Sequence, residues 1–84
     1  MSDKQQIQEK LSTKLMQLLP QQKTQPEVNV PLHSLGVDSM RLVELFIFIE
    51  MEFGIDLMKS GIEMKDIQTI ESISEYIALK RESS

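Results

Sequence analysis

Apolar residues recur at helical spacing in three stretches of this 84-residue chain, and no stretch shows the alternation typical of a β-strand. The first stretch, over about residues 3–19, forms one apolar stripe and so predicts an amphipathic helix. Ser2 and Gln5 match a capping box at its start. Pro20 ends the helix, because proline disfavours the helical conformation in the residue before it. The stripe consists of Ile7, Leu11, Leu15, Leu18 and Leu19.

The second stretch, residues 39–53, is far more apolar. Ten of the fourteen residues at positions 40–53 are apolar, and Gly54 provides a typical C-terminal stop. A helix of this composition cannot be an ordinary surface helix, which has one polar face exposed to solvent. It either lies centrally in a bundle or keeps one apolar side for a partner.

The remaining elements are shorter. Thr69 is placed to cap a last helix in which Ile70, Ile73 and Ile77 face inward, and residues 62–66 suit one short helical turn. The connection at residues 20–38 is unusually long, but its five apolar side chains predict that it packs onto the core. The sequence therefore predicts a single domain, residues 1–84, with an all-α fold: a small four-helix bundle of three main helices and one short helix, with a long loop between the first two.

Composition narrows the possible partners. The net charge is −4, and residues 39–84 carry all of it, with five basic and nine acidic side chains. This balance argues against nucleic acid as a partner and favours a basic protein surface. The longest apolar run, residues 45–49, is far below the ~20 residues that a membrane span needs, and the first ten residues contain no apolar signal core. We expect a cytoplasmic monomer with no membrane span.

Few residues offer catalytic chemistry. The chain has no cysteine, which excludes disulfides, thiolate catalysis and cysteine-based zinc sites. Its one histidine, His33, is the only candidate base for a nucleophile–base arrangement, and a lone histidine in a loop is usually just solvated. Residues 56–67 have a glycine where an EF-hand loop has one, but Met58 and Ile67 stand where calcium ligands are needed. We expect neither an enzyme nor a resident metal.

One segment combines a sharp turn with a polar helix start. Residues 35–40 read LGVDSM, in which Gly36 allows the turn and Asp38 and Ser39 come directly before an apolar helix. Taken alone, an Asp-Ser pair in this place is most simply a helix cap.

The surrounding residues resemble the attachment site of the acyl carrier protein superfamily, in which an aspartate–serine–leucine triplet follows leucine–glycine and precedes a valine–glutamate–leucine helix. This chain has LGVDSM, then LVEL, then FIEMEFGIDL, and the resemblance in the order of elements covers about residues 5–79. It implies that Ser39 receives 4′-phosphopantetheine from coenzyme A through a phosphopantetheinyl transferase, and that Asp38 contacts Mg²⁺ during the transfer. The thiol of the arm would then carry an acyl group as a thioester between acyl-loading and synthase or transferase enzymes.

The resemblance also makes the helix after Ser39 a docking surface. Its candidate docking residues are Met40, Arg41, Glu44, Glu50 and Glu52, with Asp56 just beyond. The alternative to a docking role is that these glutamates only keep the protein soluble.

Two residues depart from the family pattern. Met40 replaces the usual leucine, and Arg41 stands where fatty-acid carriers tend to be acidic, so that a cation in the first helical turn opposes the helix dipole by about 0.3–1 kcal/mol. These departures favour a freestanding carrier of a specialised lipid or polyketide-type pathway. A D-alanyl or an aminoacyl or peptidyl carrier, and a small helical adaptor in which Ser39 is only a cap, are the alternatives.

Overall fold

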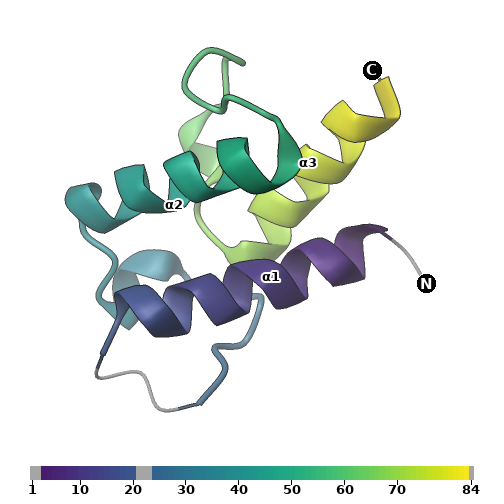
Figure 1. Cartoon of the computed structure of the whole chain (residues 1–84). Helices are drawn as coiled ribbons and strands as arrows, with labels where there is room; N and C mark the ends of the chain where they lie inside the picture. The colour runs from purple at the N-terminus through teal and green to yellow at the C-terminus, as the bar shows by residue number, and fades with distance from the viewer. Residues whose placement is uncertain (1–2, 21–23, 84) are drawn as a thin grey trace.

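Three α-helices make up most of the protein, as the computed structural model in Figure 1 shows for residues 3–20 and 24–83. These are α1 (Asp3–Leu18), α2 (Ser39–Phe53) and α3 (Ile70–Ser83). Two short 3₁₀ turns, η1 (Leu32–Leu35) and η2 (Met64–Asp66), lie in the connections, and the described residues contain no strand. The predictions of an all-α fold and of three main helices are confirmed.

The fourth helix of the predicted bundle is only partly present. Residues 62–66 were expected to form a short helix, and the structure has the three-residue turn η2 there, with Glu63 as its N-cap and Asp66 closing a capping box. The turn already ends at Ile67, whose N–H donates to the Met64 carbonyl at 3.2 Å. The capping box expected at the start of α1 involves Ser2, which lies outside the described residues.

Local signals account for the ends of the other helices. Gly54 terminates α2 with φ +74°, a conformation that glycine adopts at little cost, and its N–H donates to the Glu50 carbonyl at 2.9 Å. At the start of α3, the Thr69 hydroxyl accepts from the Ser72 N–H at 3.0 Å, and the Thr69 N–H donates to the Ser72 hydroxyl at 3.1 Å. Both ends were predicted from the sequence.

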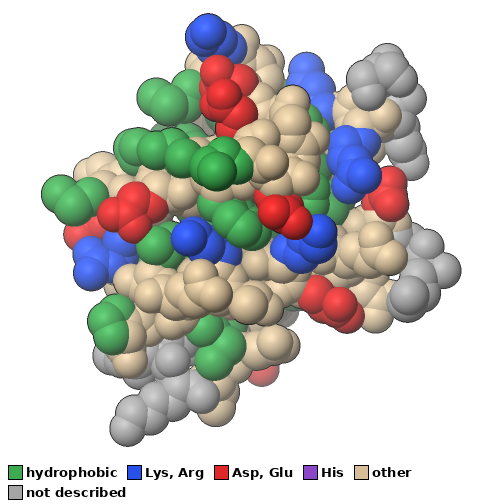
Figure 2. Space-filling model, viewed as in Figure 1, with side chains coloured by type: hydrophobic (Ala, Val, Ile, Leu, Met, Phe, Trp, Pro, Cys, Tyr) green, Lys and Arg blue, Asp and Glu red, His purple; other side chains and the backbone are tan. Residues whose placement is uncertain are grey.

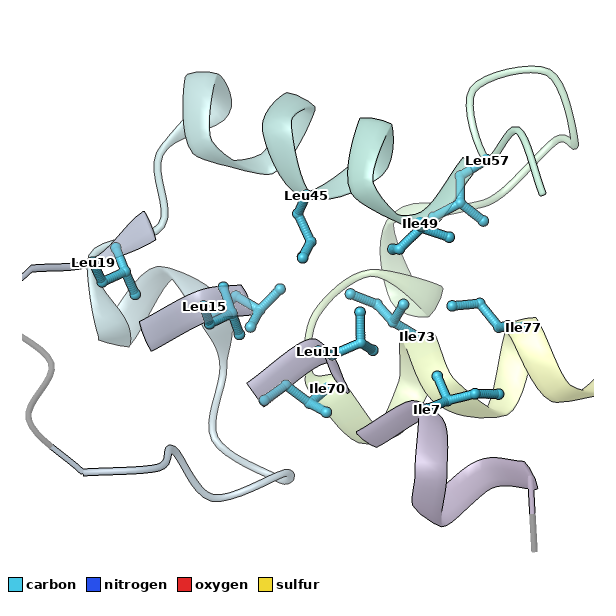
Figure 3. Close-up of a cluster of buried hydrophobic side chains, with 11 residues drawn as sticks. Ile7, Leu11, Leu15, Leu19, Leu45, Ile49, Leu57, Ile70, Ile73 and Ile77 are labelled. Carbon is cyan, nitrogen blue, oxygen red and sulfur yellow. The ribbon is translucent and has the colours of Figure 1, made fainter. Parts of the chain in front are cut away.

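The core is a layer of leucine and isoleucine side chains between the three helices. Figure 3 shows Leu45 and Ile49 of α2 pointing toward side chains of α1 and α3. Such burial contributes about 1.5–3 kcal/mol for each large aliphatic side chain. The buried apolar residues are Ile7, Leu11, Leu15, Leu19, Leu32, Leu45, Ile49, Leu57, Ile70, Ile73 and Ile77.

Only one apolar side of α2 is buried. Leu45 and Ile49 are fully inaccessible to solvent, whereas Ile47 and Met51, on the opposite side, are 52% and 83% exposed. The possibility that α2 lies centrally is therefore wrong, since α1 and α3 cover one side of it. No helix in the described part of the chain is both long and apolar enough to cross a bilayer.

The long connection between α1 and α2 packs onto the core, as its apolar residues predicted. Leu32 is buried, and Val28, Leu35 and Val37 pack against the buried cluster. Backbone hydrogen bonds join this segment to the start of α3, from the Leu32 N–H to the Gln68 carbonyl at 2.8 Å and from the Glu71 N–H to the Val28 carbonyl at 2.9 Å. The turn η1 within it was not predicted.

Two isoleucines of α2 allow a matched test of this packing. We expect Ile49→Ala to lower the free energy of unfolding by about 2–5 kcal/mol, because it opens a cavity in the core. Ile47→Ala makes the same change on the exposed side of the same helix and should cost less than about 1 kcal/mol. Urea denaturation followed by circular dichroism measures both, and equal losses would contradict the orientation of α2.

Candidate functional site

The site begins where the chain turns into α2. Gly36, with φ +96°, closes η1 and redirects the chain, and the Val37 N–H donates to the Leu32 carbonyl at 3.3 Å. Asp38 then has extended backbone angles and serves as the N-cap, because its Oδ1 accepts from the Arg41 N–H at 2.9 Å. The first intrahelical hydrogen bond runs from the Leu42 N–H to the Asp38 carbonyl. The capping role considered for Asp38 is thus observed.

Ser39 is the first residue of α2, and its side chain is exposed. Within the described residues no protein group forms a hydrogen bond with its hydroxyl. The cap of α2 is supplied by Asp38, so the Ser39 hydroxyl is not needed for it. A serine hydroxyl presented in this way is accessible to a second protein.

Arg41 bridges two helices. Its Nε donates to the carbonyl of Leu18, the last residue of α1, at 3.0 Å, and its Nη1 lies 3.2 Å from Asp38 Oδ2. The guanidinium thus lies at the negative end of the α1 dipole as well as at the start of α2, which offsets the unfavourable placement expected from the sequence. The side chain points toward α1, and whether it also contacts a partner stays a prediction.

The hydrogen bonds from Arg41 also change the acidity of Asp38. The Arg41 backbone N–H, and to a smaller extent the charge of its guanidinium, hold the pKa of the Asp38 carboxyl below its ordinary value of 3.8. Exposure to solvent limits the effect. Asp38 therefore stays ionised at neutral pH.

The outward side of α2 is an apolar stripe with acidic flanks. Met40, Val43, Ile47 and Met51 are 70%, 42%, 52% and 83% exposed, and we call these four residues the outer stripe. Figure 2 shows hydrophobic side chains gathered along α2 with acidic ones beside them. At 100° per residue, Glu44 and Glu50 lie on opposite flanks of the outer stripe, and both are exposed.

Two other acidic candidates are engaged within the protein. Lys10 of α1 donates to Glu52 at 2.7 Å, which places this carboxylate on the α1 side of the helix. Asp56 Oδ1 accepts from the backbone N–H groups of Met58 and Lys59, as a turn-forming aspartate does. The structure thus brings Ser39, Met40, Glu44 and Glu50 to the outward side of α2 and directs Arg41 and Asp56 toward groups of the protein itself. Glu52 lies at the edge between these two sides, since it pairs with Lys10 and also lines a hollow with Ile47 and Met51.

Sequence reasoning missed a small hollow beside the start of α2. It has a volume of about 140 Å³ and is formed where η1, the first turns of α2 and the η2 region meet. The apolar residues of the connection were a signal for it, but pairing them with residues 64–68 needed the fold. Its lining residues are Leu32, His33, Val37, Leu42, Met64, Ile67 and Gln68.

The acidity of Asp38 can be measured directly. We expect the ¹³C resonance of its carboxyl to titrate below pH 3.8, and Arg41→Ala to move the midpoint upward, because the variant loses the guanidinium. Since the folded-state pKa is lowered, the capping carboxylate stabilises the fold above about pH 3.8, and this contribution disappears as the pH falls through the folded-state pKa. A midpoint at or above 3.8 in the unmodified protein would contradict this view of the cap.

Comparisons with known proteins identify the family of the chain. A family model described as "Highly reducing polyketide synthase sdgA, C-terminal ACP domain" matches residues 1–84. No curated protein and no solved structure matches the chain. The matched range includes the turn at Gly36, the N-cap Asp38 and the exposed Ser39. The chain therefore belongs to the family of acyl carrier protein domains, which act as carriers and not as catalysts.

Proposed function

We propose that the protein is an acyl carrier in which Ser39 bears 4′-phosphopantetheine and which serves a polyketide-type or specialised lipid pathway. The observation that carries this proposal is the exposed Ser39 hydroxyl at the first position of α2, directly after the capping Asp38. The family match, to an acyl carrier domain of a polyketide synthase, supports an acyl cargo over an aminoacyl one. A chain without cysteine also needs an added group if it is to present a thiol.

The loading reaction is a phosphoryl transfer onto Ser39. Its Oγ forms a bond to the phosphorus that carries the pantetheine arm of coenzyme A, while the bond from that phosphorus to the adenosine bisphosphate leaving group breaks. The hydroxyl proton passes to a base of the transferase. The N–H groups of Ser39 and Met40 precede the first intrahelical bond, and with the positive end of the helix dipole they favour an anion at this position.

The residues present fit the phosphopantetheine arm and the transferase metal. The arm supplies a thiol that forms a thioester with the cargo, and the exposed Ser39 side chain would hold it. Asp38 is 59% exposed in its side chain although Arg41 is bound to it, so Mg²⁺ held in the transferase complex can reach its carboxylate. This role of Asp38 is compatible with its cap, because carboxylate oxygens have several lone pairs.

The outer stripe is the proposed docking surface for the transferase and for the enzymes that load and use the carrier. It starts next to Ser39 and extends along the whole of α2, and Glu44 and Glu50 flank it. Lys14 and Glu52 line a hollow beside Ile47 and Met51. The complementary surface is an apolar groove with Lys or Arg side chains on its rim. Glu52 is left out, because Lys10 already neutralises it.

Mass spectrometry tests the attachment site. After incubation with coenzyme A, Mg²⁺ and a broad-specificity phosphopantetheinyl transferase, we expect the chain to gain the mass of one phosphopantetheine. Ser39→Ala should gain nothing, because it lacks the attacking oxygen. Ser34→Ala is the matched control, since Ser34 is also exposed but lies in η1, and it should be loaded like the unmodified chain.

Other outcomes of that experiment are informative. An adaptor in which Ser39 has no chemical role would gain no mass in any variant, and this result would rule out the carrier proposal. Loading of Ser39→Ala would place the attachment elsewhere. Incubating the loaded protein with acyl, D-alanyl and aminoacyl donors, each with its loading enzyme, would distinguish the cargo.

A second prediction concerns docking. We expect Ile47→Glu to lower kcat/KM for loading by roughly tenfold through a higher KM, because it puts a charge in the middle of the outer stripe. Leu79→Glu makes the same change at a 58% exposed position of α3 and should leave the kinetics unchanged. Equal kinetics for both variants would show that the transferase binds another face, while leaving the attachment site in place.

A further inference from the structure

Among the described residues, the C-terminal end of α1 has neither a capping glycine nor a basic side chain of its own. Its last turn contains no basic residue, and Leu18 is followed by Leu19 and Pro20 where many helices have a capping glycine. The carbonyl groups of a last helical turn have no intrahelical partner and need one from elsewhere. Arg41, which is 23 residues further along the chain, provides one through its Nε at 3.0 Å from the Leu18 oxygen.

The same side chain holds the N-cap of α2. Arg41 Nη1 lies 3.2 Å from Asp38 Oδ2, while the Arg41 backbone N–H donates to Oδ1 at 2.9 Å. Both carboxylate oxygens are therefore bonded to Arg41. We call this arrangement of the Leu18 carbonyl, the Arg41 side chain and the Asp38 carboxylate the arginine clasp.

Apolar packing holds the first turn of α2 only in part, because Val37 and Leu42 pack against the core but are only half-buried. Leu45 is the first fully buried residue of α2, six residues or about 9 Å of helix beyond Ser39. On the other side, the nearest buried residue is Leu32, in η1. Between these two anchors, the Arg41 side chain is the one whose hydrogen bonds link the described start of α2 directly to α1.

We propose that Arg41 is a positioning residue for the loading of Ser39, acting through the arginine clasp to fix the direction of the first turn of α2. The inference rests on the proposed carrier function. A hydroxyl displaced by about 1 Å can cost up to 10²-fold in rate, so a tie at this turn affects the reaction without touching the reacting atoms. Arg41 would act on the chemical step, in contrast to the outer stripe, which acts on binding.

Arginine is suited to this task in a way that lysine is not. The clasp uses two different nitrogen atoms of one rigid planar group, Nε toward α1 and Nη1 toward Asp38. A lysine ammonium is a single donor centre on a flexible chain and cannot hold both acceptors in the same geometry. The variant Arg41→Lys therefore keeps the positive charge and loses the two-nitrogen hydrogen-bond geometry, so it tests the two contributions separately.

The test compares Arg41→Ala, Arg41→Lys and a charge control, Lys59→Ala. Lys59 is exposed, and its side chain has no hydrogen bond or ion pair among the described residues. We expect Arg41→Ala to lower kcat for loading by about three- to tenfold with KM nearly unchanged. Arg41→Lys should recover less than half of the kcat that Arg41→Ala loses. Lys59→Ala should have the same kcat and KM as the unmodified protein.

A second measurement does not require loading. In ¹⁵N spectra of the unloaded protein, the Arg41 Nε–H should give a resolved resonance that exchanges slowly with water and disappears in the variants. Amide hydrogen exchange should become faster at residues 41 and 42, whose N–H groups donate to Asp38, in Arg41→Ala and stay unchanged at Leu45 and Ile49, which the core holds. These readouts also show that each variant is folded.

The outcomes separate this inference from the proposed function. If the unmodified chain is loaded and Arg41→Ala is loaded with the same kcat, the positioning role is wrong and the carrier function stands. A loss that appears only in KM would assign Arg41 to docking and would also overturn the positioning role. If the unmodified chain is never loaded, the carrier function fails, and the positioning role fails with it even where hydrogen exchange confirms the clasp.

Discussion

A single layer of buried leucine and isoleucine side chains holds the three helices together, and it can cover only one side of each helix. For α1 and α3 this is sufficient, because their apolar residues form one stripe each. For α2 it is not, because α2 is apolar on two sides and only Leu45 and Ile49 are fully buried in the core. In the described part of the chain, α1 and α3 cover one side of α2, which leaves the outer stripe exposed.

The exposed start of α2 follows from the same constraint. The first fully buried residue of α2 is Leu45, so the first turn of the helix is packed less completely and presents Ser39 to solvent. A turn placed there needs other interactions to define it. Gly36 sets the direction of the chain, Asp38 caps the helix, and Arg41 links the turn to α1. The Ser39 side chain is therefore exposed to solvent while the backbone around it is held in one conformation.

Electrostatics on α2 differ between its sides. On the α1 side, Glu52 pairs with Lys10 and the guanidinium of Arg41 pairs with Asp38, so charges there are compensated within the protein. On the outward side, Glu44 and Glu50 flank apolar residues and the described structure shows no ion pair for either. Partner contacts on the outward side would therefore combine apolar burial with attraction of basic groups, which affects association rate and specificity.

Much of the fold and part of the site could be predicted from the sequence by itself. Helix positions, the stops at Pro20 and Gly54, and the caps at Asp38 and Thr69 depend on residues within one turn of each other, so local patterns determine them. Only the tertiary structure decided which apolar side of α2 is buried and where Arg41 and Glu52 point. Those outcomes depend on Leu18 and Lys10 of α1, which lie more than twenty residues away in sequence and come near only when the helices pack.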